Sequence, residues 1–401
     1  MTESTTDPFL TIWDEVLGGW RDLAAQMLEK LPESVRHEPQ IQHEAGRLLL
    51  EAIASACLEA VAADGDHPVF LPALNEVLNI HQPNADTLYR RAVITPGGSY
   101  RLRGRVGSMR ISRLGAMGTS PAKAGQIRAE TFYDLHELTL GADGEFDLLL
   151  SPEKPDDYHG DWRELHPEAN ALLLRQMAYD WANERDAVIS VERVDIPVAR
   201  PRPEAAELSR RMRALVRQTM FKATLLLDHV EQVRSEGAVN GVFKEWDVVG
   251  GFGGLTGQFY YETVFDLAED EALIIECDYP ESHLYASLLL ANEVFETIDW
   301  VNNHSSLNGS QWHVNSDGKL RVVVSQRDPG VQNWLDTAGY PTGIVQGRWT
   351  EASSTPMPSG RVVKVSEVLD ELPDDTVRIS PEQREQVLRD RRAAFQQRVH
   401  W

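Results

Sequence analysis

The order of strand-like and helical patterns constrains the fold of this chain more than any other feature. Between about Ser99 and Ser151, apolar and polar residues alternate in short runs, and turns such as Ala142–Gly144 separate them. Similar runs return after about Gln258. A parallel sheet needs a long, usually helical, crossover between successive strands. Because strands and helices do not alternate regularly, the sequence predicts an α+β protein with two antiparallel β-rich domains of the sandwich or jelly-roll kind.

Helical patterns occupy the N-terminal part and three later stretches. Asp7 and Pro8 have the properties of an N-cap and a first helical residue, and apolar residues then recur every three or four positions. Further helices are predicted for about residues 167–182, for residues 204–237 and after Ser380, which has the spacing of a capping box. The long helix at 204–237 is expected to connect two domains.

The chain of 401 residues exceeds the size at which a single hydrophobic core usually stops growing. Two β-rich domains with helical additions are therefore expected. The predicted parts are a helical N-terminal region (1–80), a β-rich N-terminal domain (81–200), a connector helix (201–240) and a jelly-roll-like C-terminal domain with a terminal helix (241–401).

The charge of the chain argues against two classes of partner. Lys and Arg number 39 against 62 Asp and Glu, which gives a net charge of −23. Such a field repels phosphate backbones and anionic lipid headgroups, so neither nucleic acid nor a membrane is expected as a partner. The arginine-rich terminal helix is expected to dock on its own domain or on a second subunit of a homo-oligomer. With no signal-peptide pattern, no long apolar run and only Cys57 and Cys277, the sequence predicts a cytoplasmic protein without a disulfide framework.

No motif of known catalytic mechanism is present in the chain. The glycines from Gly250 to Gly257 fail the GxGxxG frame, because Thr256 stands where the third glycine belongs. They favour a loop before a strand, or a lid over a pocket, rather than a nucleotide site. The aspartates of residues 156–161 lie in a proline-flanked loop, and His43 lacks the second histidine of a zinc helix. The sequence therefore predicts neither a metal site nor a cofactor.

Two blocks rich in polar and aromatic residues remain as candidate site regions. The first runs from Asn79 to Arg91, and the second comprises residues 300–313 and 326–349. The last segment holds four glycines, two prolines, two tryptophans and two arginines, a composition typical of a chain whose loop geometry matters more than its burial. Structural roles, such as turn capping and core packing of the tryptophans, are the alternative for both blocks.

These blocks supply the candidate site residues. Tyr89 and His304 are candidates for general acid–base work, and Arg348 or Arg327 is a candidate for stabilising an oxyanion. Asp86 is expected to orient Arg90. The candidate substrate-binding residues are Asn84, Asp86, Arg90, Arg327, Asn333 and Trp334.

The same blocks carry a resemblance to known modules. The run DPGVQNWLDTAGYPTGIVQGRW, with the preceding NSDGKLRVVVSQR, resembles the module called domain of unknown function 1214, over roughly Gln258 to Trp349. QPNADTLYRRAVI resembles the PNxDTLY signature of its usual companion, domain of unknown function 1254. The resemblance implies two β-rich domains, a jelly-roll-like C-terminal domain and oligomerisation, and no established reaction. The residues that match the family pattern are Asn84, Asp86, Tyr89, Asp328, Asn333 and Trp334.

Tryptophans and tyrosines beside a few arginines, asparagines and histidines are typical of an apolar pocket with sparse polar anchors. We therefore expect an enzyme that acts on a small, largely apolar molecule of the aromatic, steroid or terpenoid class. The expected reaction is acid–base chemistry of the lyase or hydrolase kind, and not redox chemistry, in a pocket between the two β-rich domains. The alternatives are a non-catalytic module that binds a small molecule or a protein, and a self-assembling structural protein.

Overall fold

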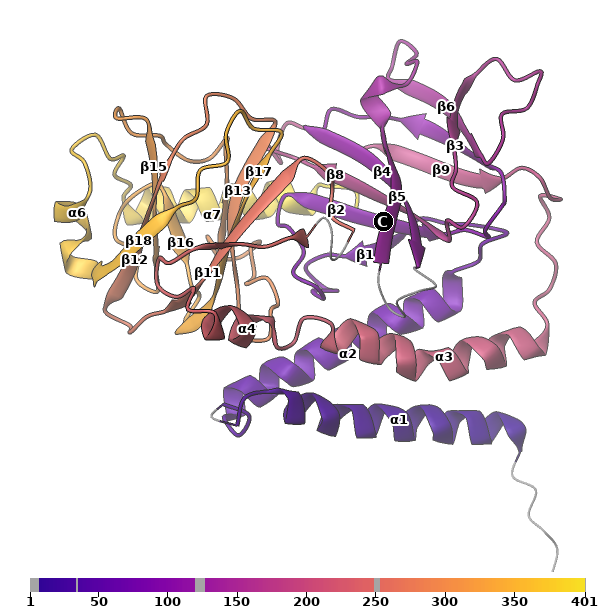
Figure 1. Cartoon of the computed structure of the whole chain (residues 1–401), viewed down its shortest axis with the longest axis horizontal. Coiled ribbons are helices and arrows are strands. Elements are labelled where there is room, and N and C mark those ends of the chain that lie inside the picture. The colour runs from indigo at the N-terminus through magenta and orange to yellow at the C-terminus, as the bar shows by residue number, and fades with distance from the viewer. Residues whose placement is uncertain (1–6, 34, 120–126, 249–252, 401) are drawn as a thin grey trace, which may run out of the picture.

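The computed structural model describes residues 7–33, 35–119, 127–248 and 253–400. The chain has an α+β fold in which two β-rich units lie side by side (Figure 1). Three long helices run beneath the sheets, and the C-terminal helix passes behind the second unit towards the middle of the molecule. This architecture confirms the predicted fold class.

The N-terminal unit is a sandwich of a five-stranded sheet, in the order β1-β2-β8-β4-β5, and a four-stranded sheet, in the order β7-β6-β3-β9. Leu102, Leu114 and Leu172 belong to its core, which both sheets enclose. Neighbouring strands are antiparallel except β6 and β7. The elements are β1 (Leu71–Leu74), β2 (Thr87–Val93), β3 (Tyr100–Arg105), β4 (Ile111–Thr119), β5 (Ile127–Asp134), η1 (Leu135–Glu137), β6 (Glu145–Ser151), β7 (Asp161–Glu164), β8 (Ala171–Met177) and β9 (Val188–Arg193).

The helix predicted for about residues 167–182 is wrong, because this segment contains strand β8. β8 lies in the middle of its sheet, between β2 and β4, and six of its seven residues are buried. A strand that is covered on both faces has no alternation of apolar and polar residues. Its continuous apolar run therefore matched the spacing of a helix face equally well.

The C-terminal unit is a second sandwich, with a five-stranded sheet in the order β10-β11-β17-β13-β14 and a four-stranded sheet in the order β16-β15-β12-β18. Its core includes Tyr261, Ile275 and Trp349. The elements are β10 (Lys244–Glu245), β11 (Gln258–Asp266), β12 (Glu271–Asp278), β13 (Tyr285–Ala291), β14 (Ser306–Asn308), β15 (Lys319–Ser325), β16 (Trp334–Asp336), β17 (Thr342–Thr350), β18 (Ser359–Lys364), η2 (Val365–Glu367) and α6 (Val368–Glu371).

The remaining helices are α1 (Pro8–Lys30), α2 (Pro39–Ala62), α3 (Ala205–Thr224), α4 (His229–Ser235) and α7 (Pro381–Gln396). The start of α1 is confirmed, because the Asp7 carboxylate accepts a hydrogen bond from the backbone N–H of Phe9. The capping box of α7 is confirmed as well, with Ser380 and Gln383 each capping the other's backbone N–H. None of the described helices has the length and apolar character needed to cross a membrane.

The single connector helix predicted for residues 204–237 is wrong, because the chain breaks into α3 and α4. Met212 of α3 packs with residues of α1 and α2, whereas Val230 and Val233 of α4 pack on the C-terminal sheet beside Val264. One straight helix cannot reach both surfaces. The break at residues 225–228 therefore follows from packing that the local pattern does not contain.

Two buried acids, Glu51 of α2 and Glu296 of the C-terminal unit, lie where these two parts of the chain meet. Glu296 is 1% exposed and accepts a hydrogen bond from Asn292 Nδ2 at 2.9 Å. Burial, together with the nearby Glu51, raises the pKa of Glu296 to about 8. Arg47 forms a 3.0 Å ion pair with Glu51. Its charge also lowers the pKa of Glu296, but by less than burial raises it.

Replacing Glu296 with glutamine is expected to remove a pH dependence of stability. The folded protein keeps this proton up to about pH 8, whereas the unfolded chain releases it near its ordinary pKa of 4.5, so stability falls as the pH rises between these values. Glu296→Gln should therefore raise the free energy of unfolding by about 4–5 kcal/mol at pH 9 and change it little at pH 4.5. Urea unfolding at both pH values measures this. The exposed Glu168→Gln is the matched control, and equal pH profiles for Glu296→Gln and wild type would contradict the assignment.

Candidate functional site

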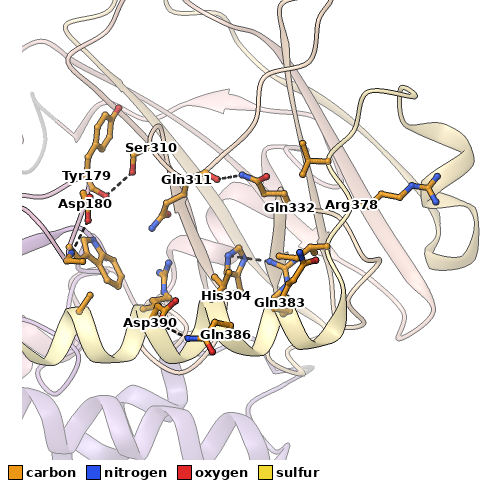
Figure 2. A pocket seen from close by; sticks show the side chains of 18 residues that line it. Tyr179, Asp180, His304, Ser310, Gln311, Gln332, Arg378, Gln383, Gln386 and Asp390 are labelled. Carbon is orange, nitrogen blue, oxygen red and sulfur yellow. Dashed lines mark hydrogen bonds between the residues drawn. The ribbon is translucent and has the colours of Figure 1, made fainter.

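A cavity of about 730 Å³ lies between the two β-rich units and α7 (Figure 2). Residues 179–182, which follow β8, supply the wall from the N-terminal unit. His304, Ser310 and Gln311 supply the wall from the C-terminal unit, and one face of α7 closes the remaining side. The cavity thus lies where three parts of the chain that are far apart in sequence meet.

His304 is buried in this wall in a neutral state. Its Nδ1 atom lies 2.5 Å from the backbone oxygen of Trp334, so Nδ1 carries the hydrogen and donates a hydrogen bond to that oxygen. Burial, with Arg384 and Arg391 close by, lowers the pKa of His304 to about 3. Its Nε2 atom is left as an acceptor and faces Arg384 Nη1 at 3.5 Å. A histidine that is so weakly basic can accept a hydrogen bond but cannot serve as an efficient general base near neutral pH.

Two arginines of α7 line the same cavity and differ in their partners. Arg384 forms a 2.9 Å ion pair with Asp328. Arg391 donates to the backbone oxygen of Trp300 and to Ser306, and its guanidinium lies 4.4 Å from the centre of the Trp181 ring. Burial lowers the pKa of Arg391 to about 10, and no described acid lies within ion-pair distance of it. These contacts show that α7 docks on its own chain through its cationic side.

A buried carboxylate, Asp86, lies behind the cavity wall and joins the two β-rich units. It accepts hydrogen bonds from Tyr285 OH at 2.6 Å, Trp181 Nε1 at 2.8 Å and Asn308 Nδ2 at 2.9 Å. Tyr285 and Asn308 belong to the C-terminal unit, whereas Trp181 belongs to the N-terminal unit. Asn84 Nδ2 donates to the Tyr285 hydroxyl at 2.9 Å. Burial raises the pKa of Asp86, and the three donors oppose that shift.

Two sheet faces bring further polar side chains to this interface. On the C-terminal unit, Tyr260, Arg348 and Ser287 are direct neighbours across β11, β17 and β13. On the N-terminal unit, Tyr89 of β2 is the direct neighbour of Arg175 of β8. In both sheets the adjacent residues of each strand point the other way, into the sandwich cores. We call these five residues the interfacial polar cluster.

The structure thus brings together several of the residues that the sequence singled out. Asn84, Asp86, Tyr89 and Arg348 all lie at the interface of the two units, and Arg348 interacts electrostatically with both Tyr89 and Asp86. His304 lies apart from them, in the wall of the α7 cavity. The proposed catalytic group of Tyr89, His304 and Arg348 is therefore divided between two places.

The expectation that Asp86 orients Arg90 is wrong. Arg90 follows Tyr89 on β2 and so projects from the opposite face of the strand. There its Nη2 atom donates to Gln176 Oε1 and to the backbone oxygen of Ala187, both at 2.6 Å. Arg90 supports the sandwich and does not face the interface.

Three other sequence candidates hold local structure. The Arg327 side chain is 59% exposed and forms a surface ion pair with Glu269. Asn333 Nδ2 donates to the backbone oxygens of His313 and Arg321, which ties β16 to the hairpin beside it. Trp334 Nε1 donates to Ser325 Oγ at 3.0 Å.

Sequence reasoning missed Arg175, Tyr260, Tyr285, Arg384 and Arg391. One signal was available for Arg175, since an arginine inside the otherwise apolar run ALLLRQM is unusual for a buried strand. The others carry no local signal, because only strand pairing and helix docking place them. Of the glycine run noted above, Gly250, Gly251 and Phe252 lie outside the described residues, while the backbone oxygen of Gly253 accepts a hydrogen bond from Arg175 at 3.0 Å.

None of the protein-family models compared matches this chain, and no curated protein matches it. Among solved structures, the chain is similar to an uncharacterized protein of Burkholderia cenocepacia, with a TM-score of 0.81 and 28% identity over 88% of this chain and 97% of that one. The VPA0106 protein of Vibrio parahaemolyticus aligns over 81% of this chain and 99% of that one, with 10% identity and a TM-score of 0.43. The similarity to the Burkholderia protein covers nearly the whole of that protein, so the two chains share the same α+β fold.

Proposed function

We propose that the protein binds a small molecule with an apolar body and an acidic group in the cavity beneath α7. The observation that carries this proposal is the composition of the cavity walls. Aromatic and aliphatic side chains line part of the cavity among polar ones, and its wall holds the buried Arg391. Arg391 forms no ion pair with a described acid, and Asp86 and Asp299 attract it only from a longer distance. Such walls are typical of sites for small, mainly apolar ligands, in which a few polar groups set the orientation.

The apolar part of the ligand would lie against the rings of Tyr179 and Trp181 and against α7. Val387 of α7 and Val377 before it add aliphatic surface on the opposite side. Gln311 and Gln332 add amide groups to the lining, and Gln332 Nε2 donates to the backbone oxygen of Gln311 at 2.8 Å. This arrangement fits an aromatic or alicyclic ring system.

The charges around the cavity favour an acidic group at its inner end. Asp180 and Asp390 are exposed at the rim, where water and salt screen them. Arg391 is 6% exposed, so its interaction with an anion would be screened far less. Because the pKa of His304 is about 3, this histidine would add a neutral acceptor and not a second charge.

These features support the binding alternative over acid–base catalysis. An enzyme of the expected kind needs a general base whose pKa lies near the working pH, and His304 does not meet this requirement. Tyr89 and Arg348, the other two proposed catalytic residues, do not line the cavity.

The test uses the protein, an extract of small metabolites and a variant that fills the cavity. Wild-type protein should retain one or more acidic, ring-containing molecules through gel filtration, and mass spectrometry after unfolding should recover them unchanged. Val387→Trp should reduce the retained amount at least tenfold, while Val198→Trp, at an exposed site far from α7 in sequence, should not. New products in place of retained ligand would support the enzyme instead. Equal retention by both variants would rule out this cavity as the site.

A further inference from the structure

A second cavity, of about 650 Å³, lies between the N-terminal unit and the helices beneath it. Its walls come from the C-terminal end of α2, one face of α3, the end of β2 and the segment that precedes α3. Its volume is typical of a site for a small molecule, and it shares no lining residue with the cavity beneath α7. We call it the α2–α3 cavity.

Two arginines of its lining have most of their nitrogens free. Arg91 Nη1, on β2, lies 3.5 Å from Glu59 Oε1, and this contact is an ion pair without a hydrogen bond. Arg200 Nε, in the segment before α3, lies 3.0 Å from Asp64 Oδ2. No hydrogen bond between described residues uses any other nitrogen of these two side chains. The Arg91 and Arg200 side chains are 33% and 43% exposed, so their free nitrogens can reach a ligand.

A third arginine, Arg211, extends the basic lining along α3. Its Nε atom donates to Glu207 Oε1 at 2.7 Å, and Nη1 donates to the backbone oxygen of Ala60 at 3.2 Å. Its Nη2 atom makes no hydrogen bond with a described residue. The neighbouring Arg210 donates to both oxygens of Glu207. The Arg211 guanidinium is therefore held between α2 and α3 before any ligand binds, which lowers the entropy cost of binding.

The acids that line the α2–α3 cavity are already bound by protein donors. Glu59 accepts from Lys222 Nζ at 3.0 Å. Asp64 Oδ1 accepts from two backbone N–H groups, at 2.9 and 3.2 Å. Asp66 forms an ion pair with Arg193. Lys222 and Arg193 do not line the cavity, so they neutralise these acids from behind. The groups that remain free for a ligand are therefore mainly the cationic donors.

Two further polar atoms of the lining, His67 Nε2 and Gln218 Oε1, are buried without a partner in the described part of the chain. The Gln218 oxygen can only accept a hydrogen bond, whereas the arginines can only donate. Gln218 lies seven residues after Arg211, on the same face of α3. A ligand satisfies both needs if it carries an anionic group for the arginines and a hydroxyl group for Gln218.

We propose that the α2–α3 cavity binds a small phosphorylated polyol, such as a sugar phosphate. The phosphate group would lie among Arg91, Arg200 and Arg211, because guanidinium groups bind phosphate oxygens through charge-assisted hydrogen bonds. A hydroxyl group of the ligand would donate to Gln218. The net charge of −23 does not prevent this, since salt screens the distant acids while the arginines contact the ligand directly.

Isothermal titration calorimetry with glucose 6-phosphate, ribose 5-phosphate and glycerol 3-phosphate tests the proposal. Wild type should bind at least one of these probes at one site per chain. It should bind inorganic phosphate and glucose about tenfold more weakly or less, because each of them offers only one half of the required chemistry. No binding of any probe at millimolar concentration, or an equal affinity for inorganic phosphate, would overturn the proposal.

Variants assign the bound probe to this cavity. Arg91→Gln and Arg200→Gln should each weaken binding about tenfold. Arg213→Gln, on α3 but outside the lining, removes the same charge and should bind as wild type does. Val387→Trp, which fills the cavity beneath α7, should also leave binding unchanged. Circular dichroism shows which variants fold, and the partly exposed Arg200 keeps the test decisive if Arg91→Gln does not. Undiminished binding by either folded variant, or an equal loss in Arg213→Gln, would overturn the proposal.

Discussion

Replacing Asp86 with alanine is expected to lower the free energy of unfolding by about 3–5 kcal/mol. The carboxylate is 2% exposed and accepts hydrogen bonds from Tyr285, Trp181 and Asn308. Alanine would leave Trp181 Nε1 buried without an acceptor. The Tyr285 hydroxyl would keep only its longer contact with Asn84 Oδ1 at 3.2 Å, and Asn308 Nδ2 only its bond to the backbone oxygen of Tyr179 at 3.1 Å. Tyr285 and Asn308 belong to the other β-rich unit. The contact between the units should therefore weaken together with the local structure.

Urea unfolding, followed by circular dichroism and by tryptophan fluorescence, measures this loss. Asp86→Asn keeps one oxygen that can accept from Trp181 and Asn308, while the Tyr285 hydroxyl can turn to accept from the new amide. Its expected cost is about 1–2 kcal/mol. Asp156→Ala, at an exposed loop position, is the control and should change stability by less than about 0.5 kcal/mol. A loss under about 1 kcal/mol for Asp86→Ala would mean that this network does not hold the units together.

Replacing Arg398 with alanine is expected to cost a similar amount, about 3–5 kcal/mol, for a different reason. The ion pair of Arg398 with Asp186 is 2.9 Å long, and both side chains are 2% exposed. Arg398 also donates to the backbone oxygens of Asp86 and Gln176. Because Arg398 follows α7 directly, these bonds tie the end of that helix to the N-terminal unit.

A double-mutant cycle separates the ion pair from the anchoring of the helix. Arg398→Ala leaves the buried Asp186 carboxylate without its ion-pair partner, so adding Asp186→Asn should recover part of the lost stability. Amide hydrogen exchange should speed up along α7 in the single variant, and ligand retention in the cavity should fall with it. Arg392→Ala, at an exposed position of α7, is the matched control. Additive losses with unchanged exchange in α7 would contradict the anchoring role.

Local signals in the sequence located many of the elements. The Asp7 cap, the Ser380 capping box and the alternation of strands β3, β4 and β6 all match the structure, because each depends on residues that are close together in the chain. Prediction failed where packing between distant segments decided the outcome. β8 resembled a helix because both of its faces are buried, and the helix predicted for residues 204–237 broke so that α4 could reach the C-terminal sheet.

The sequence located the site only in part. The run that contains Asn84, Asp86 and Tyr89, and the block that ends near Arg348, stood out through residue types that buried strands and turns rarely combine. Their meeting across the interface could not be read from either block, because hydrogen-bond partners such as Tyr285 lie some two hundred residues along the chain from Asn84.

The sequence by itself determined the antiparallel α+β class, the acidic surface and the two blocks that supply polar side chains. These follow from periodicity and composition, which are local properties. Only the tertiary structure decided that His304 joins α7 in one cavity while Tyr89 and Arg348 join Arg175 at another place. The physical reason is strand register. Successive residues of a strand point alternately into the sandwich core and towards the interface, and the pairing between strands decides which residues lie beside one another. The same register placed Arg175 beside Tyr89 and Arg348 beside Tyr260 on the sheet faces that meet at this interface.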